Sequence, residues 1–379
     1  MHAGRKLKHG HRAIFGGVIR LSPLTRKRFQ AFRRIRRAWW SLWAFVAIFV
    51  FCLAAELVSP CDPRAVVDPA TLEAYRRPTV ERAYDVKTVR FSRLDDGTVV
   101  DFEGPRDYRV EDYDVTETPR DGYVRVYMEP KSPPRVTECV RPAPPVSFPF
   151  RPCPGHPFGI DAGGRDVYAR VVHGMRIALL FGLALTFWSM FAGVVIGAVE
   201  GYFGGVTDMA CQRFTEIWSA LPFLYVMIFI GSTVGRSFTV LLVAYAIFNW
   251  ITVSYYMRAE FLRLRRFAFV DAARVQGFSA LRIVFGQILP NALTPLITLF
   301  PFLLMGAIGS LAALDFLGFG LPPMTPSCGE LLQEAQQFRG AWWLILFPSL
   351  ALFTVMLLTV LIGEGLRDAF DPRQRSRLE

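Results

Sequence analysis

The sequence has little charge and few cysteines for its length. Charged residues make up 20% of its 379 residues, and hydrophobic residues make up 52%. An average soluble chain is about 25% charged. Six cysteines are too few for a disulfide scaffold of this size, and 33 phenylalanines exclude intrinsic disorder. Because the charges are also missing from long blocks, an ordinary soluble protein is not expected.

Sequence motifs of catalysis are absent as well. No Gly-x-x-x-x-Gly-Lys-Ser/Thr run is present, so the chain is not expected to hydrolyse ATP by itself. It has no His-Glu-x-x-His and no Gly-x-Ser-x-Gly. Three of the five histidines, His2, His9 and His11, lie in a basic tail, where solvation is the simpler interpretation. We therefore expect no catalytic residue and no metal site.

Six blocks are long and apolar enough to cross a membrane, which takes about 20 residues. Prolines within them are tolerable because neighbouring helices or water can satisfy the freed carbonyls. The sequence therefore predicts an all-α polytopic membrane protein with six transmembrane helices. The predicted spans are 39–58, 177–199, 217–235, 238–257, 291–314 and 342–362.

The distribution of Lys and Arg predicts the orientation. Residues 1–38 contain 12 basic residues and no acid, and the loop 258–290 contains six Arg against two acids. Short basic segments stay on the cytoplasmic side, so both chain termini are predicted to be cytoplasmic. Binding of nucleic acid is an alternative for the basic N-terminal segment. Contact with anionic lipid is favoured, because its arginines adjoin Trp39 and Trp40 at the start of a span.

Residues 59–172 contain no spanning run and are rich in proline. Segments 86–91 and 98–102 flank Asp96-Gly97, which predicts a β-hairpin, and residues 123–127 alternate like a strand. We expect a small β-containing periplasmic insertion between the first two spans. A Cys139–Cys153 disulfide is one hypothesis for this segment, and the pairing among four cysteines on this side is open. The predicted organisation begins with a basic cytoplasmic segment (1–38), the first transmembrane helix (39–58) and a periplasmic domain (59–172). A transmembrane core of helices 2–6 (173–363) and a cytoplasmic tail (364–379) follow.

Two patterns inside the spans have alternative interpretations. Glycines at 193, 197, 201 and 205 recur every four residues, which favours close approach of another helix. Polar Asn249, Thr252 and Ser254 are candidates to line a passage, although polar packing between helices explains them equally well.

The most informative segment is the predicted cytoplasmic loop 258–290. It contains Asp271-Ala272-Ala273, three residues, Gly277, nine residues, and then Gln287-Ile288-Leu289-Pro290. Two small alanines allow a short helix to seat closely in a groove of another protein, and a glycine permits a sharp turn after it. Nearby basic residues can pair with acids of a partner. These are Arg258, Arg263, Arg265, Arg266, Arg274 and Arg282.

This spacing resembles the EAA loop of bacterial ABC-importer permeases, whose pattern is Glu-Ala-Ala, three residues, Gly, nine residues, Ile-x-Leu-Pro. Asp271 stands in place of Glu, and Gln287 in place of the first Ile. The segments 156–161, 315–320 and 363–368 are similar to permeases of the dipeptide and oligopeptide class. The basic and aromatic run 36–43, with a long domain after the first span, resembles the Yej type.

The resemblance implies a non-catalytic permease subunit of an ATP-driven importer in the bacterial inner membrane. Its cargo would be peptides or peptide-like molecules such as microcin C, moved from periplasm to cytoplasm. The implied partners are a second, unlike permease subunit, a cytoplasmic ATPase that holds ATP and Mg, and a periplasmic peptide-binding protein. The implied coupling residues are Asp271, Ala272, Ala273, Gly277, Gln287, Leu289 and Pro290. The alternative is a self-sufficient secondary transporter, although inverted repeats and paired mid-span acids are not evident.

Overall fold

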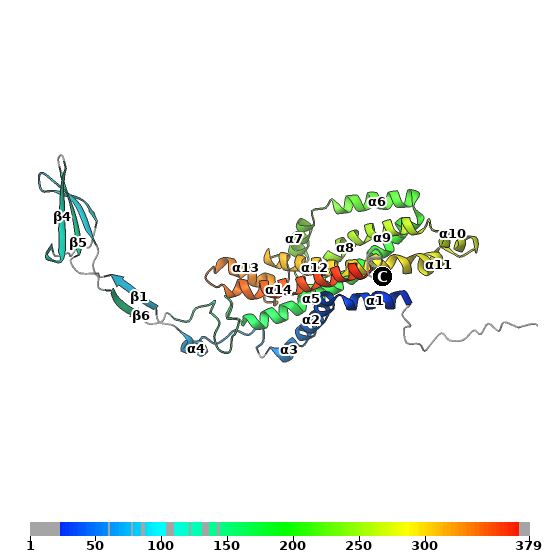
Figure 1. Cartoon of the computed structure of the whole chain (residues 1–379), viewed down its shortest axis with the longest axis horizontal. Coiled ribbons are helices and arrows are strands. Elements are labelled where there is room, and N and C mark those ends of the chain that lie inside the picture. Colours follow the sequence, from blue (N-terminus) through cyan, green and yellow to red (C-terminus); the bar gives the residue numbers. More distant parts are fainter. Residues whose placement is uncertain are drawn as a thin grey trace, which may run out of the picture. The chain divides into compact units, whose positions relative to one another are not determined.

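The computed structural model describes residues 23–59, 61–76, 79–84, 88–103, 110–120, 123–130, 136–141 and 145–370. They form two compact units, a helical unit and a strand unit that covers Asp68–Ser147 (Figure 1). The strand unit is inserted between two helices of the helical unit. Residues 1–22 of the predicted basic segment and 371–379 of the predicted tail lie outside the described residues.

The helical unit contains five helices that are long and apolar enough to cross a membrane, or up to six if one bent pair counts as a span, within the described part of the chain. Two spans consist of consecutive helices, namely α8 with α9, and α11 with α12 through a π-helical turn. The elements are α1 Pro23–Arg34, α2 Arg36–Leu53, α3 Ala55–Val58, α5 Val167–Phe203, α6 Gly205–Ser219, α7 Phe223–Thr233, α8 Phe238–Asn249, α9 Ile251–Leu264, α10 Ala268–Val275, α11 Ala280–Ile283, η3 Val284–Ile288, α12 Leu289–Phe316, α13 Cys328–Gln337 and α14 Trp343–Phe370.

The predicted third span, 217–235, is bent in the structure. Its first residues belong to α6, its remainder forms α7, and the two helix axes are bent by 69°. Pro222 immediately precedes α7. Proline has no backbone N–H to donate and disfavours helical geometry in the residue before it, so a helix arriving from α6 ends there.

The glycine repeat packs α5 against α9, which confirms the predicted close approach. A Cβ at Gly193 would lie 2.5 Å from Val253 Cβ, and a Cβ at Gly197 would lie 2.5 Å from the Ser254 carbonyl oxygen. Real Cβ atoms do not approach that closely, so only glycine fits at either position. Gly205 does not share this role, because it has φ of +57° at the start of α6.

The strand unit contains a four-stranded antiparallel sheet in the order β3-β2-β5-β4 and a separate β1-β6 pair. The predicted hairpin is confirmed, since β2 pairs with β3 and Gly97 in the turn has φ of +86°. The predicted strand at 123–127 is the first part of β5. The elements are α4 Pro69–Leu72, η1 Glu73–Tyr75, β1 Thr79–Tyr84, β2 Val89–Leu94, β3 Val99–Glu103, η2 Val110–Asp112, β4 Tyr113–Arg120, β5 Tyr123–Pro130 and β6 Val136–Arg141.

The Cys139–Cys153 disulfide stays a prediction. The side chain of Cys139 lies outside the described residues, and the two cysteines belong to different units.

Candidate functional site

The short helix α10 carries the predicted coupling motif. It buries Val270 and Ala273 in a core shared with α9 and α12. Asp271 and Ala272 are exposed on the other side. The two alanines therefore differ in role, because Ala273 seats α10 on its own chain and only Ala272 faces outward.

A glycine-dependent turn ends α10. Gly277 has φ of +77°, a left-handed conformation that favours glycine. Its N–H donates to the Arg274 carbonyl over 2.9 Å, and the Phe278 N–H donates to the Ala273 carbonyl over 3.1 Å. This pair of bonds defines a Schellman motif. It reverses the chain, and the Phe278 side chain then packs on the same core as α10.

The turn leads into the span that contains α12. Residues 280–316 run through α11, the π-helical turn and α12, and α10 contacts both α11 and the π-helical turn. Within this run Ile288 is fully buried, Gln287 and Leu289 are partly buried, and Pro290 lies in the first turn of α12. Pro290 is tolerated there because the first helical N–H groups have no intrahelical partner.

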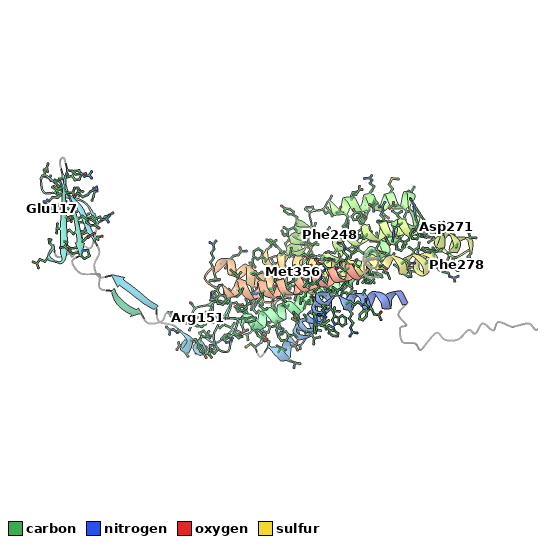
Figure 2. The ribbon with its side chains drawn as sticks, viewed as in Figure 1. Glu117, Arg151, Phe248, Asp271, Phe278 and Met356 are labelled. Carbon is green, nitrogen blue, oxygen red and sulfur yellow. The ribbon has the colours of Figure 1, made fainter. Side chains whose placement is uncertain are left out.

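We define the coupling surface as Asp271, Ala272, Arg274, Val275 and Leu281. Val275 is 90% exposed and Leu281 is 71% exposed. An ion pair of 3.0 Å joins Arg274, the residue before Val275, to Asp271. Exposed apolar side chains next to paired charges form a surface suited to docking a protein partner. Figure 2 shows Asp271 and Phe278 at one end of the helical unit and Arg151 toward the other.

The arginines near this surface separate into two groups. Arg258 makes two bonds of 2.5 and 2.7 Å to Asp208 on α6, and Arg265 donates to the Tyr202 carbonyl at the end of α5 over 3.2 Å. These two side chains join helices within the chain. Arg263, Arg266 and Arg274 are exposed, which leaves them the better candidates for contact with a partner.

The candidate passage residues lie in different surroundings. Ser254 is 1% exposed and faces the glycine repeat of α5, which fits helix packing. Asn249 donates to the Tyr245 carbonyl over 3.3 Å and is partly buried. Thr252 is exposed in this chain and remains the strongest of the three candidates for a passage or for a contact between subunits.

An ion-pair cluster that the sequence analysis missed joins α5 to α13. Arg170, with no exposed side-chain area, donates to Glu330 over 2.6 Å and to Glu334 over 3.1 Å, and also pairs with Asp161. Arg165 donates to Asp161 over 2.9 Å and to Glu334 over 3.1 Å. Three carboxylates thus face two guanidinium groups. Burial raises the pKa of both Glu330 and Glu334, while the charge of Arg170 acts in the opposite direction.

The segment 315–320, noted in the sequence, and the residues that follow it shape the turn before α13. Asp315 accepts the Leu321 N–H over 2.7 Å and also bonds the Ser327 hydroxyl. Ser327 Oγ accepts the Gly329 N–H over 3.1 Å as the N-cap of α13. A Cβ at Gly329 would lie 2.3 Å from the Ala312 carbonyl oxygen. The motif residues at this end therefore hold α13 against α12.

An exposed short helix, seated on the core of a multi-pass helical protein and followed by a glycine turn into a span, is the arrangement expected for the coupling motif of a transport permease. Residues 189–376 match the family of binding-protein-dependent transport system inner membrane components. The inner membrane ABC transporter permease protein YejE of Escherichia coli strain K12 is 37% identical over 94% of this chain and 99% of that protein.

Two further relatives support the same relationship. The peptidoglycan transport system permease protein YejE of Agrobacterium fabrum is 36% identical over 94% of this chain and 95% of its own length. The dipeptide transport system permease protein DppC of Alkalihalophilus pseudofirmus is 37% identical over 59% of this chain and 74% of its own. The chain belongs to the family of ABC-importer permeases of the dipeptide and oligopeptide class. It is a non-catalytic, multi-pass subunit of the inner membrane.

Proposed function

We propose that this subunit moves peptides or peptide-like cargo from the periplasm to the cytoplasm. The names of the relatives support this cargo class, because they refer to dipeptide, oligopeptide and peptidoglycan transport. Microcin C is a candidate within the class. The proposed topology has six spans, with α6 and α7 together as the third, both termini in the cytoplasm and residues 59–172 in the periplasm.

The proposed assembly contains a second, unlike permease subunit, a cytoplasmic ATPase that holds ATP and Mg²⁺, and a periplasmic peptide-binding protein. The single observation that carries this proposal is the position of α10. Its exposed face is free to enter a groove of the ATPase, while Val270 and Ala273 anchor it to the core of α9 and α12. A push on α10 would therefore move these spans together with it.

Val275→Asp tests the docking of the ATPase. Because Val275 is almost fully exposed, the substitution should leave folding intact but place an unpaired charge in an apolar contact. We expect the variant to reach the membrane, to lose the co-purifying ATPase and to lose ATP-dependent uptake of a labelled tripeptide in proteoliposomes. Val110→Asp, at an exposed valine of the strand unit, is the matched control and should retain all three properties.

The alternative of a self-sufficient carrier makes the opposite prediction. Uptake of the tripeptide by this chain alone, without ATP and unaffected by Val275→Asp, would contradict the proposed importer. Retention of the ATPase by Val275→Asp, with normal uptake, would contradict the assignment of the coupling surface.

A further inference from the structure

Three potential metal ligands meet at the neck of the inserted unit, which we define as residues 61–67 and 150–166. The Cys61 sulfur, a nitrogen of His156 and a carboxylate oxygen of Asp166 all lie within 4.8 Å of one another. His156 Nδ1 is 2.5 Å from Asp166 Oδ2, and these side chains are only 15% and 4% exposed. The expectation of no metal site did not consider this set, because its residues are distant in sequence.

Local backbone structure holds each of the three groups in place. Asp166 is the N-cap of α5, and its Oδ1 accepts the Ala169 N–H over 2.8 Å, which leaves Oδ2 directed at His156. His156 ends a tight turn. Its N–H donates to the Cys153 carbonyl over 2.9 Å, and its carbonyl accepts the Cys153 N–H over 3.2 Å. The Cys61 carbonyl accepts the Ser59 hydroxyl over 3.0 Å. The groups are therefore positioned before any ion binds.

We propose that the neck binds one Zn²⁺ through Cys61, His156 and Asp166. Thiolate, imidazole and carboxylate are the three ligand types of protein zinc sites, at about 2.0–2.3 Å from the metal. In tetrahedral geometry this places ligand atoms roughly 3.3–3.8 Å apart. Separations near the 4.8 Å limit of the group would have to shorten by about 1 Å, and the 2.5 Å contact between His156 and Asp166 would have to lengthen by about 1 Å. A thiolate ligand disfavours Mg²⁺ and Ca²⁺, which prefer oxygen. The ion would take the place of the direct contact between His156 Nδ1 and Asp166 Oδ2.

Cys153 is the candidate fourth ligand. It lies in the same Cys-Pro-Gly-His turn as His156, with which it forms an antiparallel backbone bridge. Its sulfur is not among the ligand atoms that lie within 4.8 Å of one another, so it would have to move toward the ion. A fourth protein ligand would make the site closed, as structural zinc sites are.

The site would fasten the two ends of the insertion to each other. Cys61 precedes the strand unit, whereas His156 and Asp166 follow it. The same two segments already meet where the Val67 N–H donates to the Gly164 carbonyl over 2.8 Å, beside the Val66–Arg165 bridge. Metal binding adds its free energy to that of folding, so Zn²⁺ would hold the neck closed against the first turn of α5.

A metal titration of the full-length protein tests the proposal. The reduced protein in detergent is treated with a chelator, titrated with Co²⁺ as a spectroscopic probe, and then with Zn²⁺. We expect one equivalent of Co²⁺ with a thiolate charge-transfer band, displacement by Zn²⁺, and a melting temperature that rises with added Zn²⁺. Cys61→Ser should abolish the band and weaken Zn²⁺ binding roughly 100-fold or more. Cys153→Ser should weaken it by a smaller factor.

Two further variants separate binding from folding. Asp166→Asn keeps an oxygen to cap α5 and should lose Zn²⁺ affinity without losing the fold. Cys211→Ser removes a cysteine of α6 and should bind Co²⁺ as the unchanged protein does. The proposal is overturned by substoichiometric Co²⁺ in the reduced protein, by unchanged affinity in Cys61→Ser, or by a Cys61–Cys153 disulfide in metal-free protein isolated without reductant.

Discussion

The guanidinium of Arg170 donates to the Glu330 carboxylate over 2.6 Å, and this bond joins the first turn of α5 to α13. Arg170 has no exposed side-chain area. Removing one partner of a buried ion pair leaves the others uncompensated in a poorly solvated site. The stability of this end of the permease should therefore depend on the whole cluster.

Arg170→Met should lower the free energy of unfolding by about 3–5 kcal/mol, as breaking a buried pair does elsewhere. Thermal melting of the detergent-solubilised protein measures the loss. Arg37→Met is the control. The side chains of Arg37 and Asp368 are 59% and 32% exposed, so their ion pair should contribute less than about 1 kcal/mol to stability. Equal melting temperatures for the two variants would show that the cluster does not stabilise the fold.

The same cluster predicts a pH dependence of stability. Burial raises the pKa of Glu330 above its ordinary value of 4.5. The folded state then binds a proton at Glu330 more tightly than the unfolded state does. The stability that this protonation adds is fully present below pH 4.5 and is lost as the pH rises through the raised pKa. Glu330→Gln cannot ionise, and its melting temperature relative to the unchanged protein should rise between pH 5 and pH 8. A constant difference across that range would argue against the raised pKa.

Substitutions at Gly277 should show whether its backbone conformation, and not the room for a side chain, requires glycine. Among the described residues, nothing lies within 4 Å of a Cβ built at Gly277, but its φ is +77°. Gly277→Val should cost roughly 1–2 kcal/mol and reduce uptake, because a branched residue disfavours this conformation. Gly277→Asn should retain more of the stability and more of the uptake, since Asn adopts a positive φ more readily than Val does.

Gly286→Ala provides the control for the Gly277 series. A methyl group added at Gly286 also meets open space among the described residues, and the φ of Gly286 is not positive. Melting temperature and ATP-dependent uptake should remain close to those of the unchanged protein. If Gly277→Val and Gly277→Asn behaved alike, the turn conformation would not be what the coupling motif requires.

Local patterns in the sequence predicted much of this fold. The β2–β3 hairpin follows from a turn residue between two strand-like runs, and the long spans follow from uninterrupted apolar blocks. The third span was predicted at 217–235, and length and hydropathy indicated its apolar block but not the 69° bend between α6 and α7 near Pro222. The coupling motif was identified by spacing, but the burial of Ala273 rather than Ala272 depends on where α9 and α12 lie.

The groups that the sequence did not reveal are those assembled from distant segments. Arg170 and Glu330 become partners only when α13 packs on α5, although the spacing of Glu330 and Glu334 by one helical turn was a usable signal. Cys61 approaches His156 and Asp166 only because the chain leaves and re-enters the helical unit at one place. Single-sequence periodicity does not indicate which distant segment supplies the partner of such a residue.

The glycine face of α5 offers a paired test of helix packing. A methyl group at Gly197 would lie 2.5 Å from the Ser254 carbonyl oxygen, a backbone atom that can move only if α9 moves. Gly197→Ala should therefore destabilise the protein by roughly 1–3 kcal/mol and reduce uptake. Gly231→Ala on α7 meets open space among the described residues and should be neutral or should stabilise the helix by up to about 1 kcal/mol. Equal effects of the two alanines would mean that the α5–α9 contact accommodates a methyl group. A loss confined to Gly197→Ala would establish that the two helices are held as closely as the 2.5 Å distance implies.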